Sequence, residues 1–288
     1  MVDLHTHSNI SDGELSPEML INEAFKRGIR ALALTDHDTI KGLKSAEIAA
    51  KKHENFHFIP GIEININWSG SKTVSGLGPG GEFHLLGLGI KKPSAAFISA
   101  VDGLFSRREA RNREILDRMH EFSIDVTWEE ILSFSGGHVV GRPHFAALLV
   151  KRKIVKNVAQ AFDRYLGVGK PFYVPKVGLT FEEAVAIICE SGGIPILAHP
   201  LSLFVAWGRL PDLIKTLKDM GLVGLEAWHP TAKSGSCRRL EILGRSLGLY
   251  ITEGSDFHGS LRPDRKLGYS GKYRKISDSV LEVIPELN

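Results

Sequence analysis

The residues that could do chemistry occur in short clusters along the chain, and the first cluster begins at residue 3. In the run Val2-Asp3-Leu4-His5-Thr6-His7, which is typical of a β-strand, two histidines are two positions apart. Alternate side chains of a strand lie on the same face. Both imidazoles, and the Asp3 carboxylate, can therefore point to one side, as a metal site requires.

Most later clusters close a short apolar run, and all are rich in metal-ligand side chains. They are Ser11-Asp12-Gly13, Thr35-Asp36-His37-Asp38, Gly61-Ile62-Glu63, Glu82-Phe83-His84-Leu85, Leu197-Ala198-His199-Pro200 and Gly254-Ser255-Asp256-Phe257-His258-Gly259. Six histidines with at least three of these carboxylates exceed the four to six ligands of one ion, so we expect two or three divalent ions. Imidazole and carboxylate without thiolate favour Zn²⁺, Mn²⁺ or Fe²⁺ over Ca²⁺ or Mg²⁺.

Clustered divalent ions can turn bound water into hydroxide at neutral pH and neutralise charge that develops on oxygen atoms. That chemistry suits phosphoester hydrolysis, in which a metal-bound hydroxide is the nucleophile and no serine or cysteine is needed. A single structural zinc would use four closely spaced ligands instead. Four isolated histidines, His53, His57, His120 and His138, are expected to be structural.

The secondary structure expected from the pattern explains how these clusters meet. Strands are predicted over 29–35, 56–66, 83–90, 195–198, 223–227 and 250–252, with helices between most of them, so a largely parallel sheet is expected. In parallel α/β barrels, active-site residues lie at the carboxyl ends of the strands. His84 is the exception, because it comes early in its strand.

Two helix starts are well marked, by Ser16-Pro17-Glu18 and by the capping box Thr180-Phe181-Glu182-Glu183. Strands are hard to find between residues 93 and 178, where helical spacing, a dense arginine face over 107–118 and a capping box at Thr127 predict a helical insertion. The segment 69–81 is rich in glycine and serine, but no helix or Gly-Lys-Ser/Thr follows, so we interpret it as a surface loop rather than a phosphate loop.

Composition sets broad limits on the protein. Its 288 residues, 43% hydrophobic and 24% charged, suit one α/β barrel or two smaller domains. A net charge of +3 is too small for a general nucleic-acid or membrane binder, and no apolar stretch reaches the roughly 20 residues of a membrane span. With two cysteines and no signal-like N-terminus, the expected location is cytoplasmic.

In this order, the clusters closely resemble the motifs of the PHP (polymerase and histidinol phosphatase) family from residue 3 to residue 259. The resemblance implies a distorted (β/α)₇ barrel with a trinuclear metal site in which Glu63 bridges ions. Barrel segments would be 1–92 and 179–288, with 93–178 as a substrate cap. The implied ligands are His5, His7, Asp12, His37, Glu63, His84, His199, Asp256 and His258.

Further motifs resemble one branch of that family, the one with an inserted helical domain. They are Arg-x-x-Arg-Asn (108–112), Ile-Asp-Val-Thr-Trp-Glu-Glu (124–130), Gly-Arg-Pro-His (141–144), Tyr-Val-Pro (173–175) and Gly-Leu-Glu-Ala-Trp-His-Pro (224–230). The resemblance implies 3′-phosphate release from nucleoside 3′,5′-bisphosphates, or trimming of short 5′-phosphorylated RNA. No obligate protein partner is evident.

Three residues outside the metal set are candidates for substrate contacts. Arg142 could clamp a phosphate bidentately, or it could form a salt bridge at a helix end. His144 and His229 could hydrogen-bond a phosphate or protonate the leaving oxygen. The arginine face over 107–118 could attract RNA, or it could be a solvated face paired with Glu109 and Glu114.

Three other functions are compatible with parts of the pattern. Histidinol-phosphate phosphatase would use the same metal chemistry, although the insertion and Gly-Arg-Pro-His argue against it. A non-catalytic metal-binding interaction module would have lost several ligands, and none is missing. An amidohydrolase also begins with His-x-His, but it would normally carry a bridging lysine, and no lysine is suitably placed.

Overall fold

The computed structural model describes residues 1–67, 81–134, 140–175, 177–271, 274–282 and 284–287. They form two compact units, Met1–Asp102 with Gly178–Asn288, and Gly103–Val177. The segment interpreted as a surface loop, 69–81, lies outside the described residues except for its last position.

Seven strands form the sheet of the first unit, and they follow one another in chain order. They are β1 (Val2–Thr6), β2 (Ala31–Leu34), β3 (His57–Asn65), β4 (His84–Leu88), β5 (Ile194–Leu197), β6 (Gly224–Trp228) and β7 (Tyr250–Glu253). Just past β7, the chain returns to the first strand. The His7 N–H donates to the Phe257 carbonyl over 3.0 Å, and the Asp256 N–H to the His5 carbonyl over 2.8 Å. The sheet thereby nearly closes, which confirms the predicted seven-stranded α/β barrel.

The sheet is largely parallel, as expected, with one strand as the exception. β4 runs antiparallel to both of its neighbours, β3 and β5, whereas the other four pairings are parallel. The first residue of an antiparallel strand lies at the same edge as the last residues of its neighbours. The early position of His84 in its strand therefore brings it to the edge where the other predicted ligands lie.

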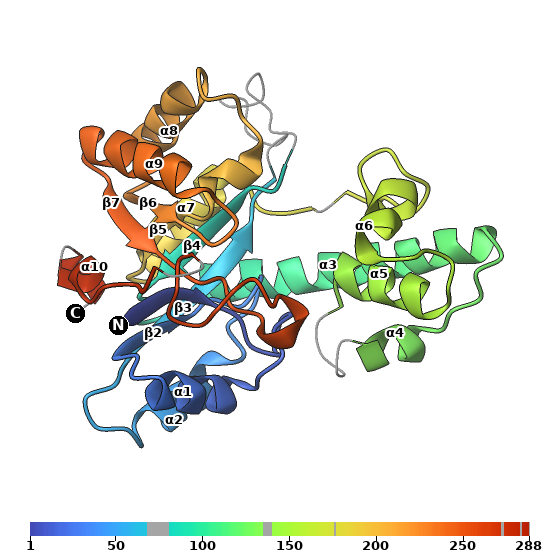
Figure 1. The fold of residues 1–288 in the computed structure, drawn as a ribbon, viewed down its shortest axis with the longest axis horizontal. Helices are drawn as coiled ribbons and strands as arrows, with labels where there is room; N and C mark the ends of the chain where they lie inside the picture. Colours follow the sequence, from blue (N-terminus) through green and yellow to red (C-terminus); the bar gives the residue numbers. More distant parts are fainter. Residues whose placement is uncertain (68–80, 135–139, 176, 272–273, 283, 288) are drawn as a thin grey trace. The chain divides into compact units, whose positions relative to one another are not determined.

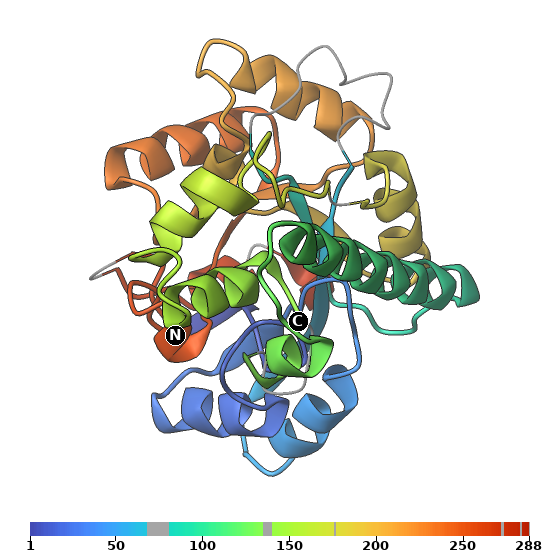
Figure 2. The same cartoon turned by 90° about the vertical axis from the view of Figure 1, so that its right-hand side faces the viewer.

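Helices cover the outside of this sheet (Figures 1 and 2). They are α1 (Pro17–Lys26), α2 (Leu43–Ala50), α7 (Phe181–Glu190), α8 (Leu210–Asp219) and α9 (Ser234–Ser246). Both predicted caps of this unit are confirmed. Ser16 accepts from the Met19 N–H, and Thr180 and Glu183 form a reciprocal capping box. These caps satisfy backbone N–H groups that a helix start otherwise leaves unpaired.

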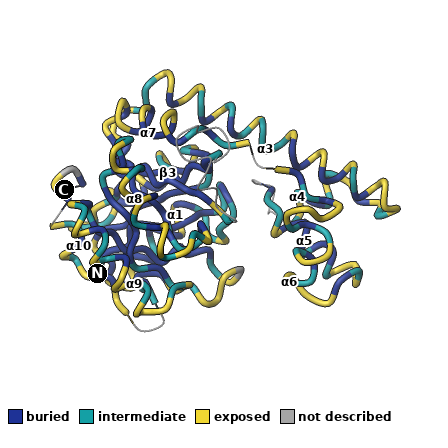
Figure 3. Tube along the Cα trace, turned by 90° about the horizontal axis from the view of Figure 1, so that it is seen from above, coloured by how far each residue is buried: buried dark blue, intermediate teal, exposed yellow. Residues whose placement is uncertain are grey.

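The barrel interior is apolar away from the predicted ligands, and Figure 3 shows the strands as its buried centre. Val2 and Leu4 of β1, Leu86 of β4 and Ile196 of β5 belong to one buried cluster. The C-terminal segment, with α10 (Ser279–Glu282) and the short 3₁₀ turn Pro285–Leu287, adds Ile284 and other apolar residues to the same cluster. A packed core of this kind holds the strands rigidly.

The second unit is helical over its described residues and has a core of its own. Its elements are the later part of α3 (Ala95–Glu121), α4 (Trp128–Phe134), α5 (Arg142–Lys151), α6 (Val158–Ala161) and a π-helical turn over Phe162–Leu166. Phe145 and Phe172 are fully buried in its cluster. The Thr127 hydroxyl accepts from the Glu130 N–H over 3.2 Å, at the predicted start of α4. No helix in the described ranges is long and apolar enough to cross a membrane.

Candidate metal centre

The nine predicted ligands converge at the end of the barrel where the parallel strands finish. They come from β1, from β3 and β4, and from the turns that follow β1, β2, β5 and β7. Their ligand atoms form four groups, each within 4.8 Å: His7, Asp12, His37 and His258; His5, His199 and Asp256; His5, His7 and Glu63; His37, Glu63 and His84. No single ion could bind all nine, so the grouping fits several ions that share ligands.

Glu63 lies at the centre of the cluster and is only 1% exposed. Each of its carboxylate oxygens faces imidazole nitrogens from different strands and turns. Oε1 is 2.9 Å from both His84 Nδ1 and His199 Nε2, and Oε2 is 3.0 Å from His37 Nδ1, 3.2 Å from His7 Nε2 and 3.4 Å from His5 Nε2. A carboxylate in this position has the geometry to bridge two ions.

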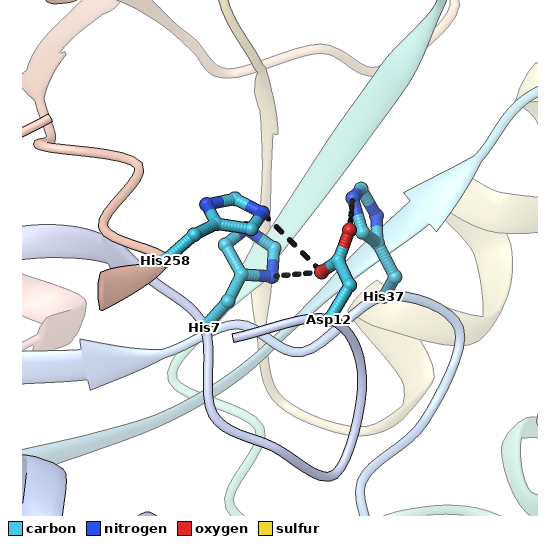
Figure 4. A group of neighbouring side chains, drawn as sticks. All are labelled: His7, Asp12, His37 and His258. Carbon is cyan, nitrogen blue, oxygen red and sulfur yellow. Dashed lines mark ion pairs between the residues drawn. The ribbon is translucent and has the colours of Figure 1, made fainter. Parts of the chain in front are cut away.

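Asp12 brings a carboxylate to a second part of the cluster (Figure 4). Its Oδ1 lies 3.3 Å from His258 Nε2 and 3.8 Å from His7 Nδ1, and its Oδ2 lies 3.9 Å from His37 Nε2. The three imidazoles surround one carboxylate, whose Oδ1 is buried and makes no hydrogen bond. Space for an ion between them is the simplest account of that spacing.

Asp256 connects the remaining ligands with two residues outside the predicted ligand set, His229 and Arg265. Its Oδ1 is 3.2 Å from His7 Nε2, and its Oδ2 accepts a hydrogen bond of 3.0 Å from His229 Nε2. The guanidinium of Arg265 also contacts Oδ2, and the Arg265 side chain is 13% exposed. Arg265 is therefore a cation at the edge of the cluster that no sequence motif had marked.

Several polar atoms inside the cluster lie close together without forming hydrogen bonds, as expected of atoms that bind a cation. His5 Nε2 and His7 Nε2 are 3.1 Å apart, although two imidazole nitrogens without a shared proton repel each other. Asp12 Oδ1, His37 Nδ1 and Glu63 Oε2 are buried and make no hydrogen bond. Buried polar atoms are normally paired, so these orphaned atoms fit bound metal ions.

The same demand for positive charge is visible in the ionisation of the cluster. Burial opposes the charge on Glu63, but the surrounding His37, His84 and His5 hold the pKa of its carboxyl well below the usual range. Burial likewise lowers the pKa of His7, yet the nearby carboxylates of Asp256 and Glu63 raise it to about 10. Metal ions would take the place of these protons, because ligating imidazoles must be neutral.

A buried hydrogen-bond network holds the loop that carries Asp12. Asp36 accepts from the Ser8 N–H over 2.8 Å, from the Ser8 hydroxyl over 2.6 Å and from the Ser11 hydroxyl over 2.6 Å. Asp3, in contrast, does not join the histidines of its strand, since an irregularity in β1 interrupts the alternation. Its carboxylate accepts from the Ser255 N–H over 2.9 Å and from the Gly268 N–H over 2.8 Å. It ties β1 to the turn that carries Asp256.

Glu226 is a buried site residue that sequence reasoning missed. It lies within β6, is 1% exposed, and hydrogen-bonds His5 Nδ1 over 3.0 Å. The only signal in the sequence was a carboxylate inside an otherwise apolar strand, in Gly-Leu-Glu-Ala-Trp. Such a residue needs a buried partner.

Three of the isolated histidines form other hydrogen bonds, as expected of structural residues. His53 Nε2 is 2.7 Å from Asn22 Oδ1, His57 Nε2 is 2.6 Å from the Leu287 carbonyl, and His120 Nε2 is 2.7 Å from the Val126 carbonyl. His138 lies outside the described residues.

Comparison with known proteins decides the family. The model of the PHP domain matches residues 3–174, more than half of the chain. The chain belongs to the PHP domain family. The match stops before His199, Asp256 and His258, so the place of these three beside the other ligands comes from the structure.

Relatives of this PHP protein are similar over most of their length. A 5′-3′ exoribonuclease of Haemophilus influenzae is 35% identical over 89% of both chains. A 3′,5′-nucleoside bisphosphate phosphatase of Chromobacterium violaceum is 30% identical over 93% of this chain and 91% of its own. A solved structure from Bifidobacterium adolescentis, described as a metal-dependent phosphoesterase, has a TM-score of 0.81 at 24% identity, covering 100% of this chain and 96% of that one. The expectation of a metal-dependent phosphoesterase is confirmed.

The predicted substrate residues of this PHP protein are divided between the two units. His229 is buried beside Asp256 and accepts the Thr231 N–H at Nδ1 over 3.3 Å. In the second unit, Arg142 begins α5 and lies 5.9 Å and 5.8 Å from the ring centroids of Phe162 and Tyr173. His144 accepts from the Gly141 N–H over 2.9 Å. Their roles toward substrate stay predictions.

The arginine face of α3 is partly neutralised within its own helix. Arg113 pairs with Glu109 at 2.8 Å and Arg118 with Glu114 at 2.7 Å, in both cases four residues apart. Exposed pairs of this kind contribute only a few tenths of a kcal/mol, roughly 0.3–0.5, to a helix. They favour the solvated face over the RNA-binding interpretation.

Proposed function

We propose that this protein releases the 3′-phosphate of nucleoside 3′,5′-bisphosphates and shortens 5′-phosphorylated RNA. The observation that carries the proposal is the clustering of all nine predicted ligand side chains, in a chain whose relatives are named for these two activities. Both substrates carry a second phosphate near the bond that is cleaved.

The donor set supports two or three divalent ions of the Mn²⁺, Zn²⁺ or Fe²⁺ type, because it combines imidazole with carboxylate. Such ions supply a nucleophile from water and neutralise charge on the phosphate oxygens. The nine predicted ligands would hold them, with Glu63 as the bridge. Neither Cys189 nor Cys237 belongs to the cluster.

The chain's own residues would bind and orient the substrate. Arg265 lies against Asp256 at the rim, and a guanidinium there can hold phosphate oxygens in pairs. Arg142 is the predicted clamp for a substrate phosphate. His229, which is hydrogen-bonded to Asp256, is the predicted donor of a proton to the leaving oxygen. We propose a cytoplasmic location, because the enzyme would encounter its nucleotide substrates there.

The test is a side-by-side turnover measurement with Mn²⁺ on the full-length protein. Adenosine 3′,5′-bisphosphate and a short 5′-phosphorylated RNA should be hydrolysed, and histidinol phosphate should be a much poorer substrate. The His5→Ala, His7→Ala double variant should abolish both activities. If the wild type prefers histidinol phosphate, or hydrolyses neither nucleotide substrate with Mn²⁺, Zn²⁺ or Fe²⁺, the proposal is wrong.

A further inference from the structure

A single buried carboxylate outside the nine predicted ligands touches two of them. Glu226 Oε1 accepts from His5 Nδ1 over 3.0 Å, and Glu226 Oε2 accepts from the backbone N–H of His199 over 2.8 Å. Each oxygen therefore holds a different ligand, one from β1 and one from the turn after β5. Glu226 itself lies on β6, which stands between β5 and β7 in the sheet. From there its carboxylate reaches both ligands.

For His5, this hydrogen bond selects one of the two neutral forms of the ring. A carboxylate can only accept, so His5 Nδ1 carries the proton and Nε2 keeps its lone pair. Nε2 is the atom that lies 3.1 Å from His7 Nε2 and 3.4 Å from Glu63 Oε2, inside the cluster. The lone pair therefore points to where an ion would bind.

For His199, the carboxylate holds the backbone rather than the ring. The backbone of His199 has a φ of 27°, which residues other than glycine rarely adopt. Its ring is held separately, with Nδ1 2.7 Å from the Ser202 hydroxyl and Nε2 2.9 Å from Glu63 Oε1. The hydrogen bond to Glu226 stabilises the turn from which this ring reaches Glu63.

The space for Glu226 is provided by a glycine. A Cβ atom at Gly254 would lie 2.5 Å from Glu226 Oε1 and 2.3 Å from the Cβ of His5. Only a residue without a side chain at the end of β7 lets the carboxylate reach His5. When a carboxylate that hydrogen-bonds the non-ligating nitrogen of a metal-binding histidine is removed, metal affinity typically falls about 10- to 100-fold.

We infer that Glu226 is a positioning residue of the metal centre, which sets the proton on His5 and the backbone of His199. The inference rests on the metal centre of the proposed function. In Glu226→Gln, the amide oxygen can accept from only one of the two donors, and its NH₂ group faces the other. One of the two hydrogen bonds is lost whichever way the amide turns.

A matched control is available in the neighbouring strand. Glu253 ends β7, is 5% exposed, and accepts from Ser270 over 2.9 Å and from Arg274 over 2.8 Å. It hydrogen-bonds neither His5 nor His199. Glu253→Gln therefore makes the same chemical change to a buried carboxylate without touching those ligands.

The experiment is a Co²⁺ titration of the metal-free, full-length protein in competition with a chelator, with the visible spectrum of bound Co²⁺ as a second readout. We expect Glu226→Gln to bind Co²⁺ at least about tenfold more weakly and with an altered spectrum, while Glu253→Gln stays within about twofold of the wild type. Wild-type affinity and an unchanged spectrum in Glu226→Gln would overturn the inference.

Two further outcomes are separable from these. If Glu226→Gln does not fold, Glu226→Asp replaces it, since the shorter carboxylate keeps both acceptors but moves them away from His5 and His199. It should then weaken Co²⁺ binding, and unchanged binding would again overturn the inference. If the wild type binds Co²⁺ as expected but hydrolyses no nucleotide substrate, the proposed function fails and the role of Glu226 stands.

Discussion

Replacing Glu63 by glutamine removes a carboxylate that faces five imidazole nitrogens within 3.4 Å. Glutamine has nearly the same shape, so the barrel core is not disturbed. Its NH₂ group, however, can only donate, and it would present protons where an ion needs an oxygen. We therefore expect Glu63→Gln to lose metal affinity without losing the fold.

The size of the effect follows from linkage between binding and folding. An ion present at 100 times its dissociation constant stabilises the folded protein by about 2.7 kcal/mol. At about 2–4 °C per kcal/mol, that raises the melting temperature of the wild type by about 5–10 °C for each ion. If the substitution weakens binding about 100-fold, the same concentration stabilises by only about 0.4 kcal/mol, and the rise falls below about 2 °C.

The assay is thermal unfolding of metal-stripped protein with and without Mn²⁺, together with the metal content after dialysis. Glu253→Gln serves as the control and should keep the wild-type rise. Should Glu63→Gln show a rise as large as the wild type and retain two or three ions per chain, Glu63 does not bridge the ions, and the interpretation of the cluster is refuted.

Three further substitutions test the parts that support the site. Gly254→Ala places a Cβ 2.3 Å from the Cβ of His5, so β7 must move. We expect the free energy of unfolding to fall by about 1–3 kcal/mol in chemical denaturation and Co²⁺ binding to weaken; an unchanged denaturation midpoint would contradict the close approach. Phe145→Ala empties the core of the second unit at a cost of about 3–5 kcal/mol; amide exchange should accelerate mainly over residues 103–177, and uniform acceleration would argue against an independent core. Thr180→Ala removes the hydroxyl that caps α7 and should cost about 1 kcal/mol in urea unfolding, whereas a neutral result would mean that Glu183 alone caps the helix.

Local patterns predicted the helices and strands of the barrel well. The caps of α1 and α7 depend on residues within four positions of each other, so the sequence contains the whole interaction. The strands were recognised because short apolar runs end in polar clusters.

The direction of a strand cannot be inferred in the same way. An apolar run has the same composition whichever way it pairs, and the antiparallel pairing of β4 is decided by β3 and β5 together. Only the early position of His84 hinted at the reversal. In a wholly parallel barrel, that imidazole would lie at the end opposite the other ligands.

Site residues whose partners lie far away in the sequence were the hardest to find. Glu226 reaches His5 from 221 positions along the chain, and Arg265 reaches Asp256 from a turn with no recognisable motif. Neither residue lies next to a predicted ligand in the sequence. Their roles depend on which groups lie beside them once the barrel closes.

The sequence by itself determined the chemical inventory of this protein: nine predicted ligand side chains, their positions next to apolar runs, and hence the expectation of a centre for several divalent ions. Tertiary structure alone decided that Glu63 lies among five imidazoles, that Asp3 turns to the backbone, and that Glu226 sets the proton on His5. The physical reason is that side-chain types and periodicity are properties of the chain, whereas the partner of each buried nitrogen or oxygen is set by contacts between strands far apart in sequence.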